Sequence, residues 1–113
     1  MTAANYNLVI DQGSDFAVNL AIKESSVAKD LTGYSARAQM RSTKSSSTVA
    51  GSFVCTVLSP ATDGLIKMEL PNATSTAMAP GLYFYDLEIH TSNDSVVKRL
   101  LQGEVTINPE VTR

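Results

Sequence analysis

The residues most able to do chemistry are few in this sequence. It contains one histidine, His90, and one cysteine, Cys55. Zinc sites need clustered Cys and His ligands, so one of each, far apart, excludes the ordinary zinc patterns. No serine lies in a Gly-x-Ser-x-Gly elbow that would make it a nucleophile. We interpret His90 as a surface residue at a strand end and Cys55 as a small buried hydrophobic residue. The sequence thus predicts no catalytic residue, no metal site and no cofactor.

One pair of carboxylates needs a separate interpretation. Asp86 and Glu88 stand two positions apart in an alternating segment, so both point to the same face of a predicted strand. Paired carboxylates can hydrolyse glycosides or bind calcium. The favoured interpretation is a solvent-exposed acidic face that pairs with cations on neighbouring strands. The candidate cations are Arg37, Arg41, Lys98 and Arg99.

The elements that must position these residues are strands, because apolar residues recur at every second position. The alternating segments are 6–10, 16–22, 34–41, 53–57, 66–70, 83–90 and 97–107. Turn-forming residues at 11–14, 62–64 and 93–95 separate several of them. We predict that 11–14 is a hairpin-like turn between the first two segments. Segment 42–48 is polar and predicts a loop, while 72–79 predicts one short helical turn that Asn72 can cap. We expect a single all-β domain over residues 1–113, an immunoglobulin-like antiparallel β-sandwich of about seven strands.

Composition narrows the possible partners. Hydrophobic residues make up 43% and charged residues 18%, which is typical of a globular chain, and the net charge is −2. Without a basic excess, nucleic acid is not an expected partner. No apolar run approaches the roughly 18 residues of a membrane span, and the N-terminus lacks a secretory signal pattern. We therefore expect no membrane partner and assembly in the cytoplasm.

Several motifs, taken in order, resemble a known family. Residues 30–41 read Asp-Leu-Thr-Gly-Tyr and then a strand ending in Arg41; residues 81–88 read Gly-Leu-Tyr-Phe-Tyr-Asp-Leu-Glu. Between them lie a Gly64-led strand and an Ala/Thr-rich turn at 73–77, and a long strand follows at 99–107. This order is similar to that of the immunoglobulin-like N-terminal domain of bacteriophage baseplate upper proteins and related small virion proteins. The resemblance covers roughly residues 5 to 113.

The resemblance implies a structural protein of the virion, in the tail or baseplate, that is assembled in the host cytoplasm. It would bind other virion proteins and copies of itself, as a free-standing adaptor without a receptor-binding tip. Tyr83 and Tyr85 are candidates for a tyrosine corner, in which a hydroxyl ties a crossing segment to the sandwich. Residues 1–5 and 108–113 could act as arms that order on contact with neighbouring subunits. Candidate partner-binding residues are Arg37, Arg41, Asp86, Glu88 and Arg113.

Three alternatives remain open at this point. The first is a head decoration or connector (neck) protein of the same virion. The second is a carbohydrate-binding β-sandwich that uses the tyrosines and the 42–48 loop. The third is an enzyme, such as a cell-wall hydrolase acting through Asp86 and Glu88; we expect no enzymatic activity.

Overall fold

The computed structural model describes residues 3–112, and these form an all-β fold. All seven predicted strands are present, and three two-residue strands are added to them. The strands are β1 (Ala4–Asn5), β2 (Leu8–Asp11), β3 (Phe16–Ala21), β4 (Lys23–Glu24), β5 (Val27–Ala28), β6 (Ser35–Arg41), β7 (Gly51–Val57), β8 (Leu65–Leu70), β9 (Gly81–His90) and β10 (Val97–Asn108). The helical pieces are a 3-10 turn, η1 (Ala61–Asp63), and α1 (Asn72–Ala77). No helix in residues 3–112 is long and apolar enough to cross a membrane.

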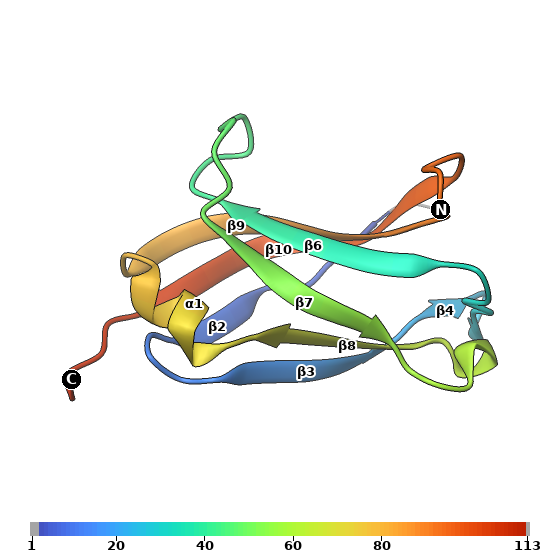
Figure 1. Cartoon of the computed structure of the whole chain (residues 1–113), viewed down its shortest axis with the longest axis horizontal. Helices are drawn as coiled ribbons and strands as arrows, with labels where there is room; N and C mark the ends of the chain where they lie inside the picture. The colour runs from blue at the N-terminus through green and yellow to red at the C-terminus, as the bar shows by residue number, and fades with distance from the viewer. Residues whose placement is uncertain (1–2, 113) are drawn as a thin grey trace.

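The strands form two facing layers that are joined into one curled sheet. The hydrogen-bonded order is β1-β10-β9-β6-β7-β8-β3, and β2 also pairs with β10. Strand β7 links the layers, because residues 51–53 pair with β6 whereas residues 54–57 pair with β8. Figure 1 shows β7 running obliquely from the β6–β9–β10 layer to the β8–β3 layer. The sandwich is therefore continuous through β7.

The N-terminal strands pair differently from the expected antiparallel pattern. Strands β1 and β2 both run parallel to β10, and each residue pairs with the one 97 positions later, as in Ala4↔Leu101 and Leu8↔Val105. The turn at 11–14 was predicted as a hairpin, which is wrong, because β3 pairs with β8 instead of β2. This turn is a corner that carries the chain from one layer to the other. Of the predicted arms, Ala4 and Asn5 are paired in β1 and Asn108 is paired at the end of β10.

The core fills the space between the layers. Inward residues of β6, β8, β9 and β10 form one hydrophobic cluster, in which Met40, Met68 and Leu87 are fully buried. The expected alternation is clear on β8 and β9, where every second side chain is buried. A β-bulge on β10, between Arg99 and Leu101, interrupts it on the last strand. The bulge buries Leu100 and turns Arg99 to the outer face, so the predicted unbroken alternation over 97–107 is wrong there.

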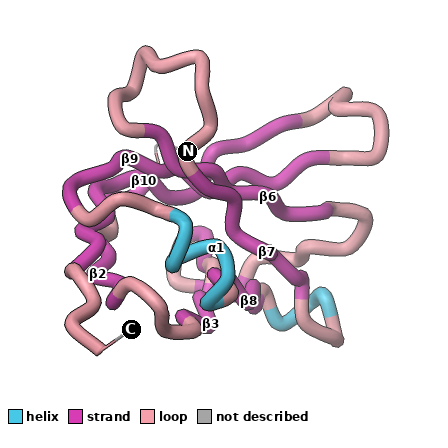
Figure 2. The backbone as a smooth tube through the Cα atoms, turned by 60° about the vertical axis from the view of Figure 1, so that its left-hand side comes forward, coloured by secondary structure: helices cyan, strands magenta, loops and turns pink. Residues whose placement is uncertain are grey.

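The short helix predicted at 72–79 is present as α1, at one end of the two layers (Figure 2). Asn72 does not cap it, because Pro71 holds the N-cap position. Instead, the Asp15 carboxylate accepts a hydrogen bond of 2.8 Å from the Asn72 backbone N–H. The buried Ser75 hydroxyl accepts from the Gly13 N–H at 3.1 Å and lies 3.0 Å from a carbonyl of the same 13–14 turn. These contacts fix the 11–15 corner against the helix.

Candidate docking face and groove

The outer surface of the β6–β9–β10 layer carries most of the predicted partner-binding residues. Strand register sets Arg37 opposite Glu88, and Glu88 opposite Arg99 on the next strand. The next row along the strands contains Gln39, Asp86 and Gln102. We call the outward side chains of these three strands the polar face. Of the five candidates, four lie on this face, and Arg113 falls outside the described residues.

Two arginines of the polar face, Arg37 and Arg99, pair with carboxylates of other segments. Arg37 Nε lies 2.5 Å from Glu88 Oε1, and its Nη1 is 3.4 Å from Asp94 Oδ2 in the β9–β10 turn. Glu88 and Asp94 raise the pKa of Arg37, through the Glu88 hydrogen bond first. Arg99 Nε lies 3.3 Å from Asp86 Oδ2. The bulge is needed for this second pair, because it turns Arg99 outward.

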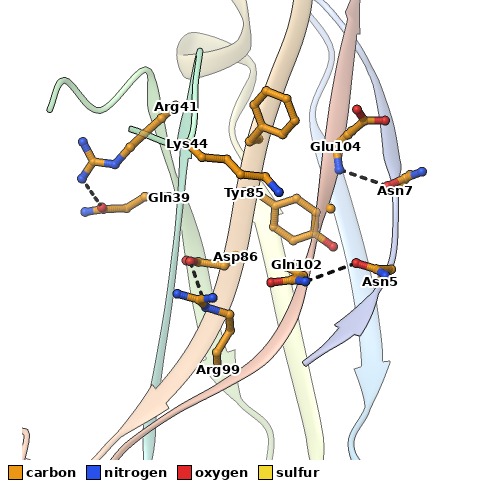
Figure 3. Close-up of a pocket in the computed structure, with 12 residues that line it drawn as sticks. Asn5, Asn7, Gln39, Arg41, Lys44, Tyr85, Asp86, Arg99, Gln102 and Glu104 are labelled. Atoms are coloured by element: carbon orange, nitrogen blue, oxygen red, sulfur yellow. Dashed lines mark hydrogen bonds and ion pairs between the residues drawn. The ribbon is translucent and has the colours of Figure 1, made fainter. Parts of the chain in front are cut away.

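A groove of about 570 Å³ opens on the polar face (Figure 3). Phe84 and Gly103 lie along it, and Arg99 and Asp86 form a pair at its side. Lys44, from the 42–48 loop, places its Nζ 5.6 Å from the centre of the Phe84 ring. This is a cation–π distance, so the loop flanks the groove with a positive charge. A second hollow of about 390 Å³ shares Gln39, Arg41 and Asp86 with the first. Its lining also includes Arg37 and Glu88.

Arg41 lies where strand and loop meet, and within residues 3–112 it does not pair with a carboxylate. Its Nη1 donates to the Ser46 carbonyl at 3.1 Å, and its Nη2 donates to Gln39 Oε1 at 3.2 Å. The guanidinium thus ties the 42–48 loop to the polar face. Of the four candidate cations for the acidic face, Arg41 thus bonds to the loop carbonyl and to Gln39, whereas Arg37 and Arg99 pair with Glu88 and Asp86.

The N-terminal segment forms one wall of the groove. The side-chain oxygen of Asn7 accepts from the Glu104 N–H at 3.0 Å, and that of Asn5 accepts from Gln102 Nε2 at 3.4 Å. Gly103 permits this approach, because a Cβ there would lie 2.4 Å from the Tyr6 carbonyl oxygen. A glycine inside a strand often marks such a close backbone contact. Gly103 is the one signal in the sequence for this wall. The sequence did not predict the hydrogen bonds of Asn5 and Asn7.

The two tyrosine-corner candidates both tie crossing segments to the core. The Tyr83 hydroxyl donates to the Ala79 carbonyl, four residues upstream, at 2.5 Å. The Tyr85 hydroxyl donates to the Tyr6 carbonyl at 2.6 Å, across 79 positions of sequence. Both rings are buried, so they do not form the open platform that the carbohydrate hypothesis used. Phe84 is the half-buried aromatic residue in the groove.

The histidine and the cysteine lie away from the groove lining. His90 is at the end of β9, where Nδ1 is 3.2 Å from Asp94 Oδ1 and 3.2 Å from the Thr91 carbonyl oxygen. Cys55 is half-buried on β7, and burial raises the pKa of its thiol to about 11. Within residues 3–112, no group of three or more His, Cys, Asp or Glu is arranged to hold a metal ion.

Comparison with known proteins adds information on the fold only. No family model matches the sequence. No curated protein matches it significantly either. Among solved structures, InlP of Listeria monocytogenes is similar, with a TM-score of 0.50 and 17% identity; the match covers 94% of this chain and 28% of InlP. The NK cell receptor Nkp44 has a TM-score of 0.46 at 10% identity, with 96% of this chain and 100% of that chain covered. A family 123 glycoside hydrolase from Clostridium perfringens has a TM-score of 0.40 at 10% identity, covering 100% of this chain and 24% of the hydrolase.

Proposed function

We propose that this chain is a structural docking module of a bacteriophage virion, in the tail or baseplate, and that it acts by binding other virion proteins, without catalysis. The observation that carries the docking role is the polar face. It combines cross-strand charge pairs, a groove of about 570 Å³ and a half-buried aromatic side chain on three rigid strands. The motif order resembling baseplate domains supports the virion assignment.

The make-up of the polar face supports a protein partner. Protein interfaces favour aromatic and arginine side chains surrounded by polar groups. Phe84 lines the groove together with Lys44 and the Arg99–Asp86 pair. Paired charges at such a face select partners with complementary charges and disfavour others. The strands that hold the groove are packed on the core, so the face is preorganised for binding.

Labelling the protein in purified phage particles tests the location. An antibody or gold label against the chain should mark the tail or baseplate in electron micrographs. A label on the capsid lattice or at the neck would contradict the tail assignment and support a head decoration or connector protein. A particle without the chain would contradict the virion assignment altogether.

Variants of the groove test the docking surface. Lys44→Glu reverses a charge beside Phe84, and Gln39→Trp fills the groove; both should reduce incorporation into particles. Lys98→Glu is the matched control, because it reverses an exposed charge on β10 at a position that does not line the groove. Each variant should retain the thermal stability of the wild type. Equal incorporation of all three variants would exclude the groove as the docking site.

A carbohydrate-binding role is a second candidate, because amide side chains and an aromatic ring line the same groove. Asn5, Asn7, Gln39 and Gln102 offer hydrogen bonds, and the Phe84 ring offers an apolar surface. A glycan array with the purified protein tests it. Binding that Phe84→Ala abolishes would favour this role over protein docking, and an array without binding would exclude it for the glycans tested.

A further inference from the structure

Strand β3 ends the hydrogen-bonded path of the sheet and leaves one edge open. Residues Phe16–Ala21 pair with β8 on one side. No strand within residues 3–112 pairs with the other side. Figure 1 shows β3 along the lower margin of the molecule, with β8 above it. This edge is separate from the polar face, so the inference below does not depend on the proposed function.

The phase of the β3–β8 ladder defines which backbone groups face outward. The Ile22 N–H donates to the Gly64 carbonyl at 2.7 Å, so the even-numbered residues of this strand bond toward β8. In an antiparallel pair the bonded residues alternate, so Ala17, Asn19 and Ala21 direct their N–H and C=O groups to the open edge. The three side chains are exposed.

The open edge extends beyond β3 through Lys23. Ser25 and Ser26 have positive φ values of 53° and 66°, and they turn the chain back to form the β4–β5 hairpin. The Lys29 N–H donates to the Ile22 carbonyl at 2.9 Å. The N–H and C=O groups of one strand residue point to the same side. The Ile22 N–H bonds to Gly64, the residue before β8, so the chain after β5 that bonds to the Ile22 carbonyl also lies on the β8 side. The hairpin partner of Lys23 therefore lies on the side away from the open edge.

This edge lacks the features that usually protect exposed strands. Proteins discourage edge pairing with charges, prolines or bulges. Between Asp15 and Lys23 the sequence is Phe-Ala-Val-Asn-Leu-Ala-Ile, with no charge, proline or glycine. Phe16 and Val18 face inward but are only half-buried at this edge. A strand added here would cover them.

We infer that a second copy of this chain pairs with the β3 edge, antiparallel and centred on a two-fold axis at Asn19. In this register Asn19 faces its own copy, and Ala17 faces Ala21. Asp15 then lies opposite Lys23 of the other copy, once on each side of the axis. Among residues facing inward, Val18 meets Leu20 and Phe16 meets Ile22. A C2 interface requires this kind of self-complementarity.

Both hydrogen bonding and charge select this register. Only pairings of odd-numbered with odd-numbered residues bring outward N–H and C=O groups of both copies together. A shift of either copy by two residues keeps that phase, but it places Asp15 or Lys23 opposite an uncharged residue. The Asp15 Oδ1 atom already accepts from the Asn72 N–H. Its second carboxylate oxygen is the one that would face the Lys23 ammonium.

Blocking the edge tests the pairing. Asn19→Pro removes an N–H that the β3–β8 ladder does not use, so the fold should survive while the pairing is lost. Asn19→Thr is the matched control, because it keeps the N–H and suits a strand. Sedimentation equilibrium over micromolar to near-millimolar protein should show a monomer–dimer equilibrium for wild type and Asn19→Thr, and monomer for a folded Asn19→Pro. A wild type that stays monomeric, or a dimer that folded Asn19→Pro retains, would overturn the inference.

Charge reversal tests the register and remains informative if the proline variant does not fold. Lys23→Asp and Asp15→Lys should each weaken self-association by about tenfold, because like charges replace both symmetry-related pairs. A mixture of the two variants should form heterodimers, since the two acidic side chains of one variant then face the two basic side chains of the other. Failure of the mixture to associate better than either variant alone would refute this register.

Discussion

The hydroxyl of Tyr85 offers a specific test of how the N-terminal wall is held. Tyr85→Phe removes the donor to the Tyr6 carbonyl but keeps the ring, which lies 6.0 Å from Phe53 in an edge-on arrangement. A hydrogen bond of this kind contributes about 1 kcal/mol net, and an acceptor left unsatisfied raises the cost to about 1–3 kcal/mol. For a chain of this length, 1 kcal/mol lowers the melting temperature by roughly 4 °C.

The loss should be localised, which distinguishes it from general damage to the core. The Tyr6 N–H bonds to the Gln102 carbonyl at 2.9 Å, so its exchange with solvent should accelerate in Tyr85→Phe. Tyr83→Phe is the matched control, because its hydroxyl bonds to Ala79 in the segment just before β9. The control should lose stability without faster exchange at Tyr6. Urea unfolding and hydrogen exchange measure the two effects.

The same group predicts a pH dependence. Burial, with a smaller contribution from nearby Tyr6, raises the pKa of Tyr85 to about 12, against about 10 for an unfolded tyrosine. Because the folded state holds the proton more tightly, the contribution of Tyr85 is complete below pH 10 and declines from there to about pH 12. Wild type should therefore lose its advantage over Tyr85→Phe in that range. Equal stability and equal exchange of the two proteins at pH 7 would refute the reasoning about the wall.

Three further predictions concern the corner, the wall and the thiol. Ser75→Ala leaves polar groups of the 13–14 turn without their partner and should lower the free energy of unfolding by about 1–3 kcal/mol in urea titrations. Gly103→Ala places a Cβ 2.4 Å from the Tyr6 carbonyl oxygen and should cost about 1–3 kcal/mol, with faster exchange in β1 as the local measurement. Cys55 should react slowly with a thiol reagent at pH 8 in the folded protein and rapidly in urea, because burial raises its pKa to about 11; equally fast labelling in both states would contradict this.

The uncharged β3 edge and the charged polar face would bind different partners. Lateral pairing through β3 would join copies of the chain, whereas the polar face on the opposite layer would remain available to other proteins. The two surfaces can be tested separately, since Asn19→Pro leaves the groove lining unchanged and Lys44→Glu leaves the β3 edge unchanged. A particle that incorporates Asn19→Pro normally would indicate that docking does not need the pairing.

Local patterns in the sequence determined the strands, the helical turn and the outward side chains of the Arg37–Glu88 pair. Alternation depends on neighbouring residues only, so it identified β8 and β9 and the outward positions of Arg37, Asp86 and Glu88. The same pattern could not reveal the bulge at Leu100, because two apolar residues in succession, Leu100 and Leu101, fit either face. The outward position of Arg99 therefore came from the structure.

Only the tertiary structure decided which strands pair, because pairing joins segments that are far apart in the sequence. The parallel placement of β1 and β2 on β10 spans 97 positions, and it created the groove wall of Asn5 and Asn7. The open edge of β3 likewise depends on strand pairing, because β2 pairs with β10 and not with β3. The sequence itself contains Asp15 and Lys23 at equal distances on either side of Asn19. Only the ladder phase shows that Ala17, Asn19 and Ala21, between these two charges, direct their backbone N–H and C=O groups to the open edge.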